Sequence, residues 1–123
     1  MLMINGVERT VGGTMYGTIM GQVRGERVEV ADAARTNSAL TNDYIVAFTS
    51  LSAGRTYTIS TADIAQKGRV IIVKDESGVA GVYNITIATQ ASEKIDGQAT
   101  LVISQNYGFV TLESNGSHLF SVS

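Results

Sequence analysis

Short strand-like runs separated by turn residues fill the chain from Tyr44 onward, and this pattern constrains the fold more than any other feature. The runs are rich in Val, Ile, Thr, Tyr and Phe, which favour strands. They read YIVAFT (44–49), TYTIS (56–60), RVIIVKD (69–75), VYNITIAT (82–89), TLVISQ (100–105), YGFVTLES (107–114) and HLFSV (118–122). The intervening DESGVAG, EKIDGQA and SNGS place Gly near Asp, Asn or Ser, as turns do. Turn signals about every ten residues predict an all-β fold, either an antiparallel β-sandwich or a small barrel.

One helical turn is expected near residues 61–67, within STADIAQKG. Ser60 can cap its start, and Gly68 can adopt the left-handed conformation that ends it. No segment predicts a helix long enough for a parallel crossover connection, so the strands are expected to pair antiparallel.

Side-chain alternation predicts which residues of the strands are buried. The segment RVIIVK (69–74) is apolar almost throughout, which is typical of a central strand covered on both faces. In NITI and FVTL the alternation places one set of side chains on a shared apolar face, namely Ile85, Ile87, Val110 and Leu112.

Residues 1–40 differ from the rest of the chain, because glycines are spread through them. We expect an extended, Gly-rich N-terminal arm over 1–40, followed by a β-sandwich domain over 41–123. A hairpin near VRGERVEV would place Gly25 in its turn. The arm could hardly bury its apolar side chains against itself, so these are candidate assembly residues: Leu2, Met3, Ile4, Met15, Tyr16, Ile19 and Met20.

Composition argues against several classes of partner. Charged residues make up 16% of the chain and the net charge is −2, which offers no electrostatic basis for binding nucleic acid. No uncharged apolar run reaches the roughly 20 residues that span a bilayer, so no membrane partner is expected. The chain has no Cys, which excludes disulfides and thiolate metal sites.

Candidate chemical sites are few. The single histidine, His118, would need several carboxylates to complete a zinc site, so a surface or strand-edge position is expected. Asp75, Glu76 and Ser77 could bind calcium together with backbone carbonyls, but the EF-hand spacing is missing. The plainer interpretation is a polar hairpin loop from Lys74 to Tyr83, with Asp75 and Glu76 as turn and solubility residues.

Catalytic motifs are also missing from the sequence. There is no G-x-S-x-G serine motif and no G-x-x-x-x-G-K-[ST] phosphate loop. We therefore expect a protein that is not an enzyme, with no catalytic, cofactor-binding or metal-binding residues and no cofactor.

Three segments, in this order, resemble a module of bacteriophage tail-fibre and other virion proteins. They are NDYIVAFTSLSAGRTYTIS, KGRVIIVKDESGVAGVYNITI and EKIDGQATLVISQNYGFVTLESNGSHLFSV, which together cover about residues 42–123. The shared features are the K-G-R strand ending in K-D, the later N-I-T-I, the I-D-G turn and the closing Y-G-x-V-x-L-x-S. Such modules often carry Trp after the last turn, where this chain has Leu119 and Phe120.

The resemblance implies a compact β-sandwich that is frequently trimeric, structural or adhesive, and without active-site residues. Combined with the apolar arm, it leads us to expect a capsid decoration (cement) protein on the surface of the phage particle, made in the bacterial cytoplasm. Its partners would be the major capsid protein or tail proteins, together with its own copies in a trimer. Alternatives are a short tail-fibre or tail-tip protein that binds a receptor or carbohydrate, or a carbohydrate-binding module using DESGVAG and exposed tyrosines.

Overall fold

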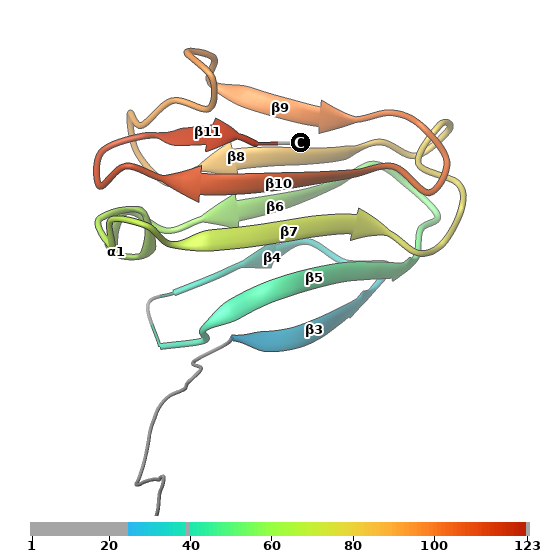
Figure 1. Ribbon diagram of the computed structural model, residues 1–123. Helices are drawn as coiled ribbons and strands as arrows, with labels where there is room; N and C mark the ends of the chain where they lie inside the picture. The colour runs from blue at the N-terminus through green and yellow to red at the C-terminus, as the bar shows by residue number, and fades with distance from the viewer. Residues whose placement is uncertain (1–24, 39, 123) are drawn as a thin grey trace, which may run out of the picture.

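The computed structural model describes residues 25–38 and 40–122, and it is mostly strand with almost no helix. This confirms the predicted all-β class. The strands form two sheets (Figure 1). The first, called here the β7 sheet, has the order β11-β10-β7-β5-β3, and the second, the β8 sheet, has the order β4-β6-β8-β9.

Strands β5 to β11 overlap the seven runs expected from the sequence, whereas β3 and β4 precede them. In the β7 sheet they are β3 (Glu26–Ala31), β5 (Asp43–Ser50), β7 (Val70–Asp75), β10 (Phe109–Ser114) and β11 (Leu119–Ser121). In the β8 sheet they are β4 (Arg35–Thr36), β6 (Arg55–Ile59), β8 (Ile85–Thr89) and β9 (Thr100–Ile103).

Both sheets are open and mix parallel with antiparallel pairs, so the expectation of antiparallel pairing is wrong for much of the fold. From β3 to β8 the chain alternates between the two sheets. Strands β3, β5 and β7 therefore run parallel to one another, as do β4, β6 and β8. Antiparallel pairs occur later, between β7 and β10, β10 and β11, and β8 and β9. A strand of the other sheet makes each parallel crossover, which removes the need for a crossover helix.

Two of these strands come from the segment expected to form the extended arm. Strands β3 and β4 lie within residues 1–40, yet each pairs with a strand of the following region. Val30 is 6% exposed and belongs to the core, because alternation along β3 turns it inward. The described part of residues 1–40 thus belongs to the sheets, where β3 pairs parallel to β5. The first strand of the hairpin expected around Gly25 lies outside the described residues.

The candidate assembly residues all lie outside the described residues, in the segment 1–24. They are Leu2, Met3, Ile4, Met15, Tyr16, Ile19 and Met20.

Buried side chains from both sheets form one hydrophobic cluster. The four residues predicted to share an apolar face are all buried, which confirms the alternation: Ile85, Ile87, Val110 and Leu112. Strand β7 is central in its sheet, as expected. Only Ile71, Val73 and Asp75 of β7 are buried, however, while Val70, Ile72 and Lys74 are half-exposed. The expectation that both faces of this strand are covered is therefore wrong, because its side chains alternate between the core and the outer face of the sheet.

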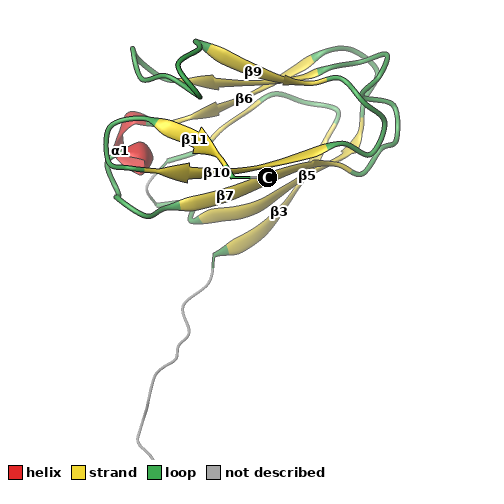
Figure 2. Ribbon diagram, turned by 45° about the horizontal axis from the view of Figure 1, so that its top comes forward, coloured by secondary structure: helices red, strands yellow, loops and turns green. Residues whose placement is uncertain are grey.

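The single expected helical turn is present as α1 (Thr61–Ile64), at one end of the strands (Figure 2). The Ser60 hydroxyl accepts a hydrogen bond from the Asp63 N–H at 3.2 Å, and Gly68 has φ +88°. The prediction for Ser60 is confirmed. Gly68 adopts the expected left-handed conformation but does not end the helix, whose C-cap residue is Ala65. Within the residues described, no helix has the length and apolar character needed to cross a membrane.

Candidate functional site

Asp75 is the last residue of β7, and its carboxylate is fully buried. One oxygen, Oδ1, accepts hydrogen bonds from the Ser77 N–H at 2.9 Å, the Ser77 hydroxyl at 2.5 Å and the Gly78 N–H at 3.1 Å. The other, Oδ2, accepts from the N–H groups of Ala80 and Tyr107, both at 3.0 Å. Burial alone would raise the pKa of Asp75, but these hydrogen bonds hold the pKa below its ordinary value.

This arrangement corrects the sequence interpretation of the segment Lys74–Tyr83. Strands β7 and β8 lie in different sheets, so the segment connects the sheets and is not a hairpin loop. Asp75 is a buried organising residue and not a solubility residue. Glu76 points elsewhere, because both its oxygens bind the Arg27 guanidinium at 2.8 and 2.9 Å. The two neighbouring carboxylates are thus committed to different partners.

Tyr107 is held in a strained backbone conformation by the same carboxylate. Its φ is +61°, which is unusual for a bulky residue. Its N–H donates to Asp75, and its carbonyl accepts a hydrogen bond from the Lys74 ammonium. Its ring lies against Gly78, where an added Cβ would come within 2.5 Å of the Tyr107 Cζ. Tyr107 nevertheless remains 61% exposed, so the fold fixes this aromatic residue at the surface.

Tyr107 lines an open groove of about 490 Å³ along the turn between β9 and β10, called here the β9–β10 groove. Its lining residues are all uncharged: Leu101, Val102, Ile103, Ser104, Gln105, Asn106, Tyr107, Gly108, Phe109 and Val110. Phe109 is 56% exposed, and the Lys74 Nζ lies 5.6 Å from the centre of its ring. The turn lies at the end of the strands opposite α1 (Figure 1).

The groove is tied to the β7–β8 connection by a second hydrogen bond. The Gly81 N–H donates to the Asn106 Oδ1 at 2.9 Å. An added Cβ at Gly81 would lie 2.8 Å from that oxygen, so the absence of a side chain permits this close approach. The connection and the turn therefore form one hydrogen-bonded unit through Asp75 and Asn106.

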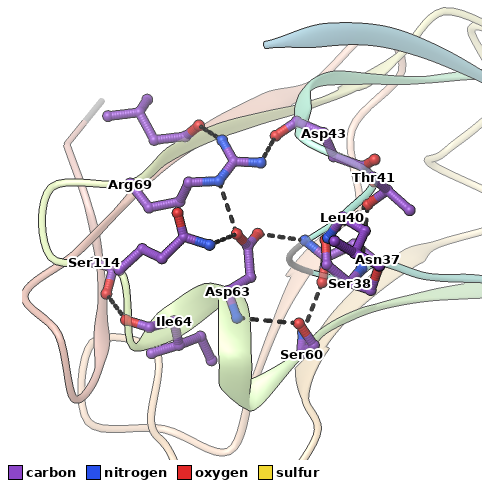
Figure 3. Close-up of polar contacts among 12 residues, drawn as sticks. Asn37, Ser38, Leu40, Thr41, Asp43, Ser60, Asp63, Ile64, Arg69 and Ser114 are labelled. Atoms are coloured by element: carbon purple, nitrogen blue, oxygen red, sulfur yellow. Dashed lines mark hydrogen bonds and ion pairs between the residues drawn. The ribbon is translucent and has the colours of Figure 1, made fainter.

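A second polar cluster surrounds α1 and is buried (Figure 3). Asn37 donates to the Asp63 Oδ2 at 2.6 Å and accepts from the Ser60 N–H at 2.7 Å. Arg69 donates through Nε to the Asp63 Oδ1 at 2.8 Å, and its Nη2 reaches the backbone carbonyl of Asp43. These contacts join α1 to the segment after β4 and to the start of β5.

The Asp43 carboxylate extends this cluster toward the β8 sheet. Arg35 binds it with two hydrogen bonds of 2.8 Å, and the Tyr57 hydroxyl donates to it at 2.9 Å. Burial would raise the pKa of Asp43, but the bonds from Arg35 and Tyr57 hold the pKa below its ordinary value. Burial, together with the Asp43 charge, raises the pKa of Tyr57. The carboxylates of Asp43 and Asp63 accept hydrogen bonds from the protein's own donors, which makes the cluster a structural one.

His118 lies just before β11 and is exposed, in the strand-edge position expected from the sequence. Its Nδ1 accepts a hydrogen bond from the Lys94 N–H at 3.0 Å. Over residues 25–38 and 40–122, no three His, Asp or Glu side chains gather closely enough to hold a metal ion.

Sequence reasoning missed the groove. Tyr107 was placed in the strand run 107–114, whereas β10 begins at Phe109. An aromatic residue between two turn-forming residues, Asn106-Tyr107-Gly108, is the signal that could have indicated a displayed ring.

The comparisons with known proteins place the chain in no family. No protein-family model matches the sequence, and no curated protein matches it either.

Proposed function

We propose that the chain is a non-enzymatic bacteriophage virion structural protein of the capsid-decoration type, its two sheets packed as a β-sandwich. The virion part of this proposal rests on the resemblance of residues 42–123 to phage virion modules. The observation that supports its non-enzymatic part is the use made of the buried carboxylates. Asp43, Asp63 and Asp75 each accept hydrogen bonds from guanidinium, amide or backbone donors of the chain itself. They stabilise a rigid frame and are not free to act as a base or nucleophile.

In this proposal the N-terminal segment supplies the attachment to the head. Its apolar side chains would be buried on neighbouring capsid subunits, and such burial stabilises by about 25 cal/mol per Å² before ordering costs. The sheets would form the outward knob and the contact between copies in a trimer.

Location on the particle is the most direct test of the decoration role. Antibody labelling of the phage particles that carry the chain, viewed by electron microscopy, should place the label over the head. Label confined to the tail would replace decoration by the second candidate below, and particles without label would contradict a virion role.

Deletion of residues 2–22 tests the attachment role of the N-terminal segment. The shortened protein should still fold, with a far-ultraviolet circular dichroism spectrum typical of β-strands, because β3 to β11 are retained. It should lose binding to undecorated capsids in a sedimentation assay. Full binding by the shortened protein would refute this role.

The oligomeric state is a separate measurement. Light scattering of the purified chain should give three times the chain mass of 13.0 kDa. A monomer at every concentration tested would contradict a self-assembled trimer.

The β9–β10 groove favours a second candidate, a short tail-fibre or tail-tip protein with a receptor- or carbohydrate-binding role. Exposed rings at Tyr107 and Phe109, next to a rigid loop, are typical of a recognition surface. Here the sheets would present the groove to a cell surface instead of to the solvent around a capsid.

A further inference from the structure

We propose that the β9–β10 groove binds a neutral oligosaccharide, with the Tyr107 ring as the platform for a sugar ring. This inference rests on the recognition role of the second candidate, and it names the ligand class and the residues that would contact it. Sugar binding is measured on the purified chain, so its failure can be told apart from a failure of the predicted position on the particle.

The charge of the groove selects the ligand class. None of the residues lining the groove carries a charged side chain. The nearest described cation at the rings is Lys74, whose ammonium already donates to the Tyr107 carbonyl. An anionic ligand would find no free positive charge in the lining, and a cationic one would find no carboxylate. A neutral ligand therefore fits the groove best.

The lining combines the two kinds of group that a sugar needs. Tyr107 and Phe109 offer apolar ring surface to the C–H face of a pyranose. Three exposed polar residues lie between β9 and these two rings, namely Ser104, Gln105 and Asn106. Hydroxyl and amide groups both donate and accept hydrogen bonds, as sugar hydroxyls do. Among the described hydrogen bonds, Asn106 uses only Oδ1, which leaves its Nδ2 for a ligand.

The strained backbone of Tyr107 supports a binding role for its ring. A bulky residue at φ +61° costs free energy, and the fold compensates with the Asp75 and Lys74 hydrogen bonds. The result is an exposed ring on an immobilised backbone, which reduces the ordering cost when a ligand binds. Core packing does not require the ring, because it lies at the surface.

A peptide strand is a poorer occupant than a sugar. Addition of a strand to a sheet edge depends on a continuous row of backbone groups. Strand β9, the edge strand beside the groove, has only the residues Thr100–Ile103, and the chain then turns through the groove lining.

The test is calorimetric titration of the full chain with three neutral probes and one anionic probe. The neutral probes are maltohexaose, cellohexaose and linear mannohexaose, and the anionic comparator is trigalacturonate. At least one neutral probe should bind, and amide NMR shifts should change at residues 104–109. Tyr107→Ala should weaken that binding about tenfold or more, as the loss of a central aromatic contact does. Tyr107→Phe should bind within about threefold of the original chain, because it keeps the ring.

The matched control is Phe120→Ser, which removes an exposed aromatic ring from β11, outside the groove lining. It should bind as the original chain does. The proposal is overturned if no neutral probe binds at millimolar concentration, if trigalacturonate binds more tightly, or if Tyr107→Ala leaves binding unchanged. Particle labelling decides the virion role independently of these results.

Discussion

Asp75 shows how much one buried carboxylate can organise. Its two oxygens accept hydrogen bonds from Ser77 and from the backbone N–H groups of Gly78 and Ala80 in the β7–β8 connection. They also accept one from the Tyr107 N–H in the β9–β10 turn. Each bond to a charged acceptor contributes about 1.5–3 kcal/mol when its loss leaves a buried donor unsatisfied. The position of Tyr107 therefore depends directly on the charge of Asp75.

Asp75 should make the free energy of unfolding depend on pH in the acidic range. Its pKa is lowered by folding, so its contribution is present above the unfolded pKa of about 3.9 and is lost as pH falls through the lower folded value. Asp75→Asn should lose about 2–3 kcal/mol at pH 7, because an NH₂ group then faces backbone donors. Its unfolding free energy should also fall less steeply below about pH 4.

Urea unfolding at several pH values measures this effect. Glu76→Gln is the control, since Glu76 is bonded to Arg27 at the surface. A pH dependence in Asp75→Asn as steep as that of the original chain would contradict the assignment.

Backbone strain at Tyr107 predicts that two substitutions at this position differ in stability. Glycine tolerates φ +61° and alanine does not, although both remove the ring. Tyr107→Gly should therefore be more stable than Tyr107→Ala by about 1 kcal/mol, although both should lose sugar binding. Thermal unfolding of the two variants gives the difference. Equal stability would mean that the backbone there is not strained.

At the scale of the elements, α1 is stabilised by contacts distant in sequence more than by its own length. Four residues make too short a helix to be stable alone. The Ser60 cap satisfies one N–H, while Asn37 and Arg69 hold the Asp63 side chain from either side (Figure 3). The Ser114 hydroxyl of β10 also donates to the Ile64 carbonyl. The turn is thereby attached to both sheets.

This dependence predicts that two substitutions near α1 lower the free energy of unfolding by different amounts. Ser60→Ala removes one capping bond and should cost about 1 kcal/mol. Asn37→Ala should cost more, about 3 kcal/mol, because it leaves both the buried Ser60 N–H and one Asp63 oxygen without their partner. Urea unfolding free energies measure both losses. A smaller loss for Asn37→Ala than for Ser60→Ala would show that the Asn37 bonds contribute little.

At the scale of the whole molecule, the core unites strands from both sheets and from both predicted regions of the chain. Val30 of β3 packs in the same cluster as Phe48 of β5 and Tyr57 of β6. Arg35 of β4 neutralises the fully buried Asp43 of β5. The strands before residue 41 are therefore part of the folding unit.

The two N-terminal deletions should accordingly behave differently. Removal of residues 1–40 takes away Arg35, and a buried carboxylate that loses its partner costs about 3–5 kcal/mol. The loss of Val30 from the core adds to this cost. The protein without residues 1–40 should unfold at a much lower urea concentration than the full chain, whereas the protein without residues 2–22 should not. Circular dichroism measures both unfolding curves. Equal midpoints for the two deletions would restore the boundary near residue 41.

The sequence by itself determined the local structure of this protein. Runs of strand-forming residues located the strands after residue 41, and alternation with period two assigned Ile85, Ile87, Val110 and Leu112 to the core. Ser60 marked the start of the helical turn, and Gly68 marked a left-handed position in the turn that follows it. These features depend on neighbouring residues alone, since backbone propensity, capping and side-chain direction are local properties.

Only the tertiary structure decided the direction of pairing and the roles of the polar residues. Parallel and antiparallel strands share the same alternation, so the passage of the chain between two sheets leaves no local signal. Asp75 beside a glycine-rich loop looks the same whether it is exposed or buried, because one of its donors, the Tyr107 N–H, lies 32 residues away. The groove arises from the same non-local contacts, since they fix Tyr107 at the surface.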